Sequence, residues 1–354
     1  MSELLHFLKS MISIPGLSGH EAPVARLLAQ TWSPLVDELT HSKLGSIHGL
    51  KKGSGRTSQP SVMIATHMDA IGLMVSRIVD GFLYLAGIGG VDPRVLPGTP
   101  VAVHATDTNE ELYGVIVMPP AALLPEGKGN DAVGLNHLFV DTGLTSAEVA
   151  KRVKVGDLVS FATEPLDMPG AYISGHTLDN RASIAALTLC LEALQNRDHF
   201  WDVYALASVQ EETNYAGAAT SAYQLRPSIA IAVDVTHAKG PGTNDYSAIP
   251  LGNAITLGIG PSMHPHLYRR LKEVAEKAEI PVVDDAVPLL SYTDADALQL
   301  SAEGIPTMLV SIPLRYMHTP VEMIALKDVQ RAGRLLAEFV TSLEADFIHR
   351  IVWD

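Results

Sequence analysis

Apolar runs of strand length alternate with amphipathic stretches over most of the chain. The apolar runs occupy residues 61–66, 202–209, 229–233 and 308–312. Apolar residues recur at helical spacing in the stretches 2–13, 22–32, 181–195, 265–278 and 326–345. Buried strands that alternate with helices are typical of a parallel sheet covered by helices. The pattern therefore predicts an α/β fold whose mostly parallel central sheet is flanked by helices.

The pattern changes between residues 71 and 165. Short alternating segments such as "GFLYLAG", "TPVAVHAT" and "GDLVSFA" are separated by Gly, Pro and Asp, and the one longer helical stretch is "TSAEVAKRV". Such a texture indicates a β-rich unit. Because the α/β pattern resumes afterwards, we expect a small β domain at 71–165 that interrupts a main domain formed by 1–70 and 166–354.

Composition excludes some classes of function. The net charge of −14 disfavours nucleic acid as a partner, because there is no excess of Lys and Arg to meet phosphate. No apolar run has the length of a membrane span, and the N-terminal segment lacks the layout of a signal peptide. The single cysteine, Cys190, excludes a disulfide within the chain, so we expect a cytoplasmic protein.

Histidine and acidic residues follow the predicted strands. These residues are His67 and Asp69, Glu211 and Glu212, Asp234, and His318, and a further acid, Asp179, stands two residues before a predicted helix. Each of them taken singly also fits a helix cap or a solvated turn. Ligands of an open α/β sheet bind at the carboxyl ends of its strands, however, so we expect these side chains to meet at one edge.

Two histidines with several acids and no cysteine are the ligand set of a zinc, cobalt or manganese centre. The excess of acids suggests two ions, which need a bridging carboxylate between them. That ligand count uses five residues, namely His67, Asp179, Glu212, Asp234 and His318. It leaves Glu211 as a general base beside a water between the ions. Asp69 is expected to orient the His67 imidazole.

Motifs along nearly the whole chain resemble those of a known family. They include "PGLSGHE", "ATHMDAIGLMV", "LDNRAS", "QEETNYAGA", "VDVTHA" and "RYMHTPVE". Together they resemble the tetrahedral, dinuclear-metal aminopeptidases, which include glutamyl, leucyl and lysyl aminopeptidases and some relatives labelled endoglucanase. The resemblance implies an α/β peptidase domain with an inserted β-barrel-like domain, dimers that assemble into a hollow dodecamer, and short peptides as substrates.

The resemblance also implies a role for each site residue. One metal ion would be held by His67, Asp179 and Asp234, and the other by Asp179, Glu212 and His318, with Glu211 as the base. Zinc or cobalt is expected, with manganese as the third candidate. The chain departs from its relatives at Ala70, where an acid is frequent, and at Ser291 and Tyr292, where Gly-Gly is frequent.

Other functions use similar residues. A metal-dependent deacylase or carboxypeptidase would share the water chemistry, and Arg315, close to His318 in sequence, is the residue that a carboxypeptidase could use for a terminal carboxylate. A glycosidase fits poorly, because its two carboxylates flank the scissile bond whereas Glu211 and Glu212 are neighbours. A non-catalytic scaffold is disfavoured because no ligand and no base is missing.

Overall fold

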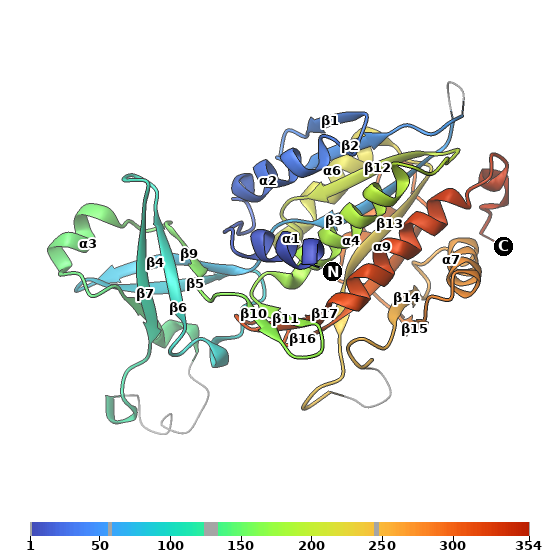
Figure 1. Cartoon of the computed structure of the whole chain (residues 1–354). Helices are drawn as coiled ribbons and strands as arrows, with labels where there is room; N and C mark the ends of the chain where they lie inside the picture. The colour runs from blue at the N-terminus through green and yellow to red at the C-terminus, as the bar shows by residue number, and fades with distance from the viewer. Residues whose placement is uncertain (1, 56–58, 124–133, 244–247, 354) are drawn as a thin grey trace.

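A computed structural model describes residues 2–55, 59–123, 134–243 and 248–353. It consists of a helix-flanked central sheet and, beside it, a small β-barrel (Figure 1). In the part of the chain that the structure describes, no helix is long and apolar enough to cross a membrane.

The central sheet has eleven strands among the described residues. Nine follow one another in the order β1-β2-β12-β3-β13-β16-β17-β11-β10, while β14 pairs with β16 and β15 pairs with β14. Their bounds are β1 (Glu38–His41), β2 (Ile47–Lys51), β3 (Ser61–His67), β10 (Leu166–Met168), β11 (Tyr172–Gly175), β12 (Asp202–Ser208), β13 (Ile229–His237), β14 (Ile255–Ile259), β15 (Val282–Ala286), β16 (Thr307–Arg315) and β17 (Glu322–Ala325).

The middle of this sheet is parallel. Strands β12, β3, β13 and β16 run in one direction, and the last residues of β12 and β3, Ser208 and His67, are direct partners. All four strands are apolar and almost entirely buried, as expected for a sheet covered on both faces. Antiparallel pairs join the outer strands β1, β2, β17, β11 and β10. The sheet is therefore mixed, with a parallel centre.

Helices cover both faces of the sheet. Helices α4 (Leu178–Leu194) and α9 (Leu326–Thr341) pack together on the face seen in Figure 1, and α6 (Ala216–Leu225) lies behind the sheet. The remaining helices of this body are α1 (Ser2–Ile12), α2 (Ala22–Trp32), α5 (Glu211–Asn214), α7 (Pro265–Lys277) and α8 (Asp294–Gln299). The predicted fold class is thus confirmed.

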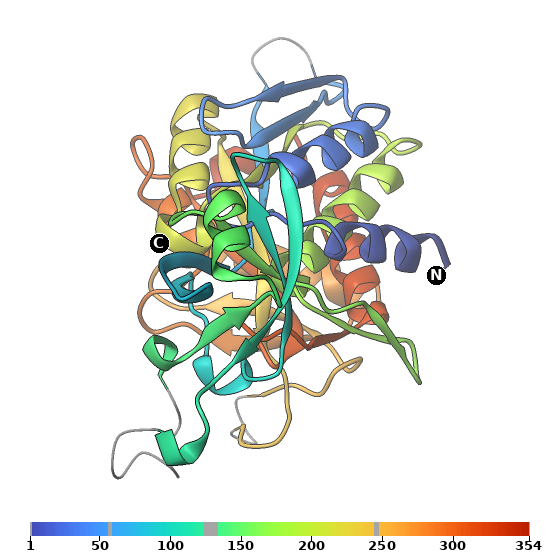
Figure 2. The same cartoon turned by 90° about the vertical axis from the view of Figure 1, so that its left-hand side faces the viewer.

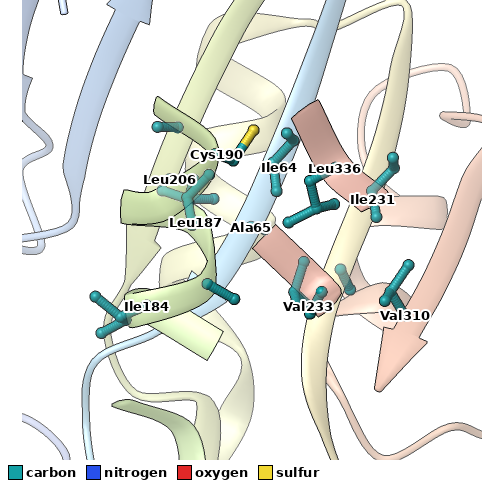
Figure 3. Close-up of a cluster of buried hydrophobic side chains, with 14 of the residues drawn as sticks. Ile64, Ala65, Ile184, Leu187, Cys190, Leu206, Ile231, Val233, Val310 and Leu336 are labelled. Carbon is teal, nitrogen blue, oxygen red and sulfur yellow. The ribbon is translucent and has the colours of Figure 1, made fainter. Parts of the chain in front are cut away.

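The main hydrophobic core lies between the parallel strands and the α4–α9 pair. Figure 3 shows Leu187 of α4 beside Leu206 and Leu336 of α9 near Ile64, with Ile184 farther along α4 in the same core cluster. Each of these side chains is fully buried. Burying an aliphatic side chain contributes about 1.5–3 kcal/mol, so this layer holds the strand ends in place.

The barrel is the second body. Its strands close in the order β4-β5-β8-β7-β6-β9. Their bounds are β4 (Gly72–Val79), β5 (Phe82–Ile88), β6 (Pro100–Ala105), β7 (Glu110–Val117), β8 (Phe139–Asp141) and β9 (Leu158–Phe161), with helix α3 (Ser146–Arg152) beside them. It has a hydrophobic cluster of its own, which includes Leu73, Val103 and Val159. Figure 2 shows the barrel in front of the central sheet.

Candidate metal centre

The histidines and acids predicted from the sequence meet at the carboxyl ends of the parallel strands. All of them except Asp69 line a cavity of about 420 Å³. His67 is the last residue of β3, and Asp234 lies in β13 just beyond Ala232, where β13 stops pairing with β3. The two strands separate there, so the Asp234 carboxylate can turn towards His67. Its Oδ1 lies 3.7 Å from His67 Nε2.

Asp179 lies between the two histidines. Its Oδ1 is 3.2 Å from Nε2 of His67, and its Oδ2 is 3.4 Å from Nε2 of His318. Glu212 Oε2 completes the second group at 3.5 Å from the same His318 nitrogen. Asp179 and its neighbour Asn180 have non-helical backbone angles although they belong to the first turn of α4. The carboxylate of Asp179 therefore faces both groups at once.

These spacings fit metal ligands. Two ligand atoms bound at 2.0–2.1 Å to one tetrahedral ion lie about 3.3 Å apart. The four distances from the histidine nitrogens to Asp179, Asp234 and Glu212 run from 3.2 to 3.7 Å. Glu212 Oε1 is also buried without a hydrogen-bond partner. The two groups could each hold an ion, with Asp179 shared.

Glu211 and Glu212 begin the short helix α5 directly after β12. Glu211 is 7 % exposed, and its Oε2 lies 3.8 Å from His67 Nε2. His67, Glu211 and Glu212 together form a further group with metal-ligand spacing. The geometry therefore brings both glutamates to the site, and places Glu211 on the His67 side of it.

Asp69 is fully buried and contacts three residues of the site. Its carboxylate accepts hydrogen bonds from the backbone N–H groups of Glu211 and Glu212, at 2.9 and 3.1 Å. The Nδ1 atom of His67 lies 3.2 Å from the Asp69 carbonyl oxygen and 3.5 Å from its carboxylate. The sequence suggested only the contact with the imidazole. The sequence did not predict the hydrogen bonds from the backbone of Glu211 and Glu212 to Asp69, because no local pattern indicates which amides a carboxylate contacts.

His318 is oriented from the barrel side of the molecule. Its Nδ1 lies 3.1 Å from the carbonyl oxygen of Gly90, in the segment that follows β5. When Nδ1 donates to that carbonyl, Nε2 is left unprotonated on the side of Asp179 and Glu212. A side chain at position 90 would collide with the ring, since a Cβ there would lie 2.6 Å from Nδ1. Gly90, within the motif "GIGGVDPRVLPG", was not singled out from the sequence.

The acids of the site repel one another in the absence of a cation. Burial, together with the charges of Asp234, Asp294 and Glu212, raises the pKa of Glu211. Burial and the charge of Asp179 likewise raise the pKa of Glu212. Burial alone would lower the pKa of His318, but Asp179 and Glu212 outweigh it and raise that pKa to about 9. These raised pKa values show that the buried acids would be stabilised by a positive charge in the site.

Asp294, in the first turn of α8, is an additional buried acid near the site. It is 2 % exposed and accepts a hydrogen bond from the hydroxyl of Ser208, the last residue of β12. Burial raises its pKa to about 7. The sequence alone gives Asp294 no role, because an acid in the first turn of a helix is commonly explained by the helix dipole.

The departures noted in the sequence have separate environments. Ala70 is buried and its carbonyl accepts a hydrogen bond from Ser18 N–H, whereas Ser291 and Tyr292 line the cavity. Tyr292 is 74 % exposed and has a left-handed backbone with φ of 55°. Arg315 donates from Nε to the carbonyl of Lys239 and is not among the residues that line the cavity.

Comparison with known proteins assigns the family. Residues 45–335 match the family model described as M42 glutamyl aminopeptidase. The chain belongs to this family. A lysyl aminopeptidase of Pyrococcus furiosus is 34% identical over 342 residues, which are 95% of this chain and 96% of that protein.

Solved structures agree with the M42 assignment. The aminopeptidase APDkam598 of Desulfurococcus kamchatkensis has a TM-score of 0.91 and 34% identity, over 99% of this chain and 98% of that one. The TET1 peptidase of Pyrococcus horikoshii has a TM-score of 0.84 and 27% identity, over 96% and 100% of the two chains. It assembles into a tetrahedron or a large octahedral shell. The M42 chain described here is therefore an aminopeptidase, a hydrolase of a metal-dependent family.

Proposed function

We propose that the site holds two divalent ions, one on His67, Asp179 and Asp234 and the other on Asp179, Glu212 and His318. The observation that carries this proposal is the position of Asp179, with one oxygen facing each histidine. Imidazole and carboxylate ligands suit zinc or cobalt, and manganese is the third candidate.

Two bound ions would supply Lewis acidity, which polarises a scissile carbonyl and makes a water more acidic. Glu211 accepts the proton of the attacking water and passes it to the leaving amine. Its place suits this role, because it is buried beside the ligands and Asp69 holds its backbone N–H. Asp69 also keeps His67 in one orientation, which leaves Nε2 for the ligand side. General acid–base catalysis of this kind contributes about 10²–10⁴-fold.

The substrate is a short peptide bound through its free N-terminus. Among the described residues lining the cavity there is no lysine or arginine that could take a terminal carboxylate. The ionisable groups of the lining include the acids Asp179, Glu211, Glu212 and Asp234, a lining that suits a protonated α-amine better than a free carboxylate. This charge pattern favours an aminopeptidase over a carboxypeptidase. Tyr292, exposed at the cavity, is the residue we expect to influence the preferred first side chain.

Blocked peptides test this function. Acetylation of the N-terminus of a good peptide substrate should remove most of the activity, whereas amidation of its C-terminus should change the rate little. Release of the first residue by the metal-loaded enzyme is the measurement. Hydrolysis that tolerates acetylation but needs a free carboxyl end would refute the aminopeptidase assignment and support a carboxypeptidase.

The same proposal covers the assembly and the division of the chain. We place the catalytic domain at 1–70 and 166–354 and the inserted domain at 71–165, since the barrel strands run from Gly72 to Phe161.

Dimers along the edges of a tetrahedron, the shape that the TET1 peptidase takes, give a closed dodecamer. Light scattering should give a mass near twelve chains, and a monomer at micromolar concentration would contradict this. The single buried Cys190 fits a cytoplasmic location.

A further inference from the structure

Glu322, the first residue of β17, contacts the backbone of two proposed metal ligands. Its Oε1 accepts a hydrogen bond from His318 N–H at 2.9 Å, and its Oε2 accepts one from Asp179 N–H at 3.1 Å. The side chain is 1 % exposed. One buried carboxylate therefore joins two segments that lie far apart in the sequence, and both carry side chains of the second metal group.

Neither amide belongs to a regular helix or strand. His318 follows β16 and has a left-handed backbone with φ of 62°, and Asp179 has φ and ψ of −78° and 103° at the start of α4. A buried N–H without a partner is costly, and a non-glycine residue in the left-handed region needs outside support. Glu322 supplies the partner for both amides.

A cation lies near this carboxylate. Arg181 is fully buried, its guanidinium donates to the carbonyls of Met11 and Ile14, and its positive charge acts on both Asp69 and Glu322. A buried carboxylate is tolerated when it accepts hydrogen bonds and has an opposite charge nearby. Burial and the charge of Asp179 raise the pKa of Glu322, while the two amide hydrogen bonds and the charge of His318 oppose that rise and favour the charged form.

We propose that Glu322 is a positioning residue of the metal centre, which sets the separation of Asp179 and His318 by holding their backbone amides. This inference rests on the proposed metal function. A merely structural alternative exists, because Glu322 also pairs with Gly175 in the β11–β17 ladder. The two roles differ in what they predict. Positioning changes the affinity for metal, while a ladder contact changes stability alone.

Graded substitution separates the two roles. Glu322→Gln keeps the size of the side chain but leaves one acceptor oxygen for two amides, and Glu322→Ala leaves none. Loss of a residue that orients metal ligands typically lowers metal affinity by about 10–100-fold. We expect roughly tenfold weaker zinc binding in Glu322→Gln and a larger loss in Glu322→Ala, measured by competition with a chromogenic chelator. In both variants the affinity should fall most for the ion proposed to bind Asp179, Glu212 and His318.

Asp328→Asn is the matched control. Asp328 is also a fully buried carboxylate that accepts from a backbone amide, Gly252 N–H, but its partners Gly252 and Arg331 do not line the cavity. The Asp328→Asn substitution should lower the melting temperature of the metal-free protein and leave its zinc affinity unchanged. Equal zinc affinity in the wild type, Glu322→Gln and Asp328→Asn would overturn the inference, while a wild type that binds no metal would instead overturn the proposed function.

A measurement on the wild type avoids any folding defect of the variants. Hydrogen exchange of the metal-free protein, followed by mass spectrometry of peptides that cover Asp179 and His318, reports whether these amides are held before metal binds. Slow exchange at both positions supports the inference. Exchange as fast as that of exposed loop amides would show that Glu322 does not hold them, and would refute it.

Discussion

We propose different roles for three glutamates of this site because they have different neighbours. Glu211 and Glu212 are adjacent in sequence, yet Glu212 Oε2 lies 3.5 Å from His318 Nε2 whereas Glu211 lies on the His67 side. Glu322 points at backbone N–H groups instead of side chains. The sequence can nominate the first two from their place after a strand. It cannot nominate Glu322, because nothing local distinguishes an acid at the start of a strand from a solvated one.

Exchanging one carboxylate at a time tests the assignment of the glutamate pair. Glu211→Gln should retain both metal ions and lose about 10²–10⁴-fold in turnover, because it removes the proton acceptor. Glu212→Gln should lower the metal content, because it removes a ligand. Metal analysis alongside kcat on an unblocked peptide measures both effects. If Glu211→Gln lost metal while Glu212→Gln kept it, the two roles would have to be exchanged.

Gly90 offers a second test at single-residue scale. In Gly90→Ala the new Cβ would lie 2.6 Å from His318 Nδ1, so the ring must move and the affinity for the second ion should fall by about tenfold or more. Gly87→Ala is the control, since its Cβ would meet its nearest neighbour at 3.7 Å, an ordinary contact. Equal zinc affinity in these two variants would argue against the orientation of His318 by Gly90.

At the scale of elements, the sequence predicts the buried centre of the sheet better than its edges. The apolar runs at 61–66 and 308–312 are strands β3 and β16 because both faces of each are covered. Strand β15 was not predicted, since three of its five residues are exposed and β14 is its one partner among the described strands. Such a strand forms because β14 offers hydrogen bonds, which no apolar pattern reports.

The packing of α4 on α9 depends on the lack of a side chain at Gly333. A Cβ there would lie 2.6 Å from the carbonyl oxygen of Ala186, a backbone atom that cannot move aside easily. Gly333→Ala should therefore lower the free energy of unfolding by about 1–3 kcal/mol, measured by urea titration. Lys327→Ala, at an exposed position of the same helix, should change it by less than about 0.5 kcal/mol. Similar stability of the two variants would contradict this packing.

At the scale of the whole molecule, the sequence predicts two bodies but not how they meet. Gly89 and Gly90, directly after barrel strand β5, lie against Glu212 and His318. The contact between Gly90 and His318 joins residues 228 positions apart. Local periodicity carries no information over such a distance, so it could not place this segment beside the metal ligands. The barrel thereby contacts the residues that we propose as ligands of the second ion.

The central claim is that two divalent ions bound by this chain are needed for release of an N-terminal residue. The most direct test strips the protein with a chelator, adds zinc or cobalt stepwise, and follows bound metal per chain together with hydrolysis of an unblocked peptide. We expect no activity without metal, saturation at two ions per chain, and full activity only when the second ion binds. Full activity in the thoroughly stripped protein, or saturation at one ion, would contradict it.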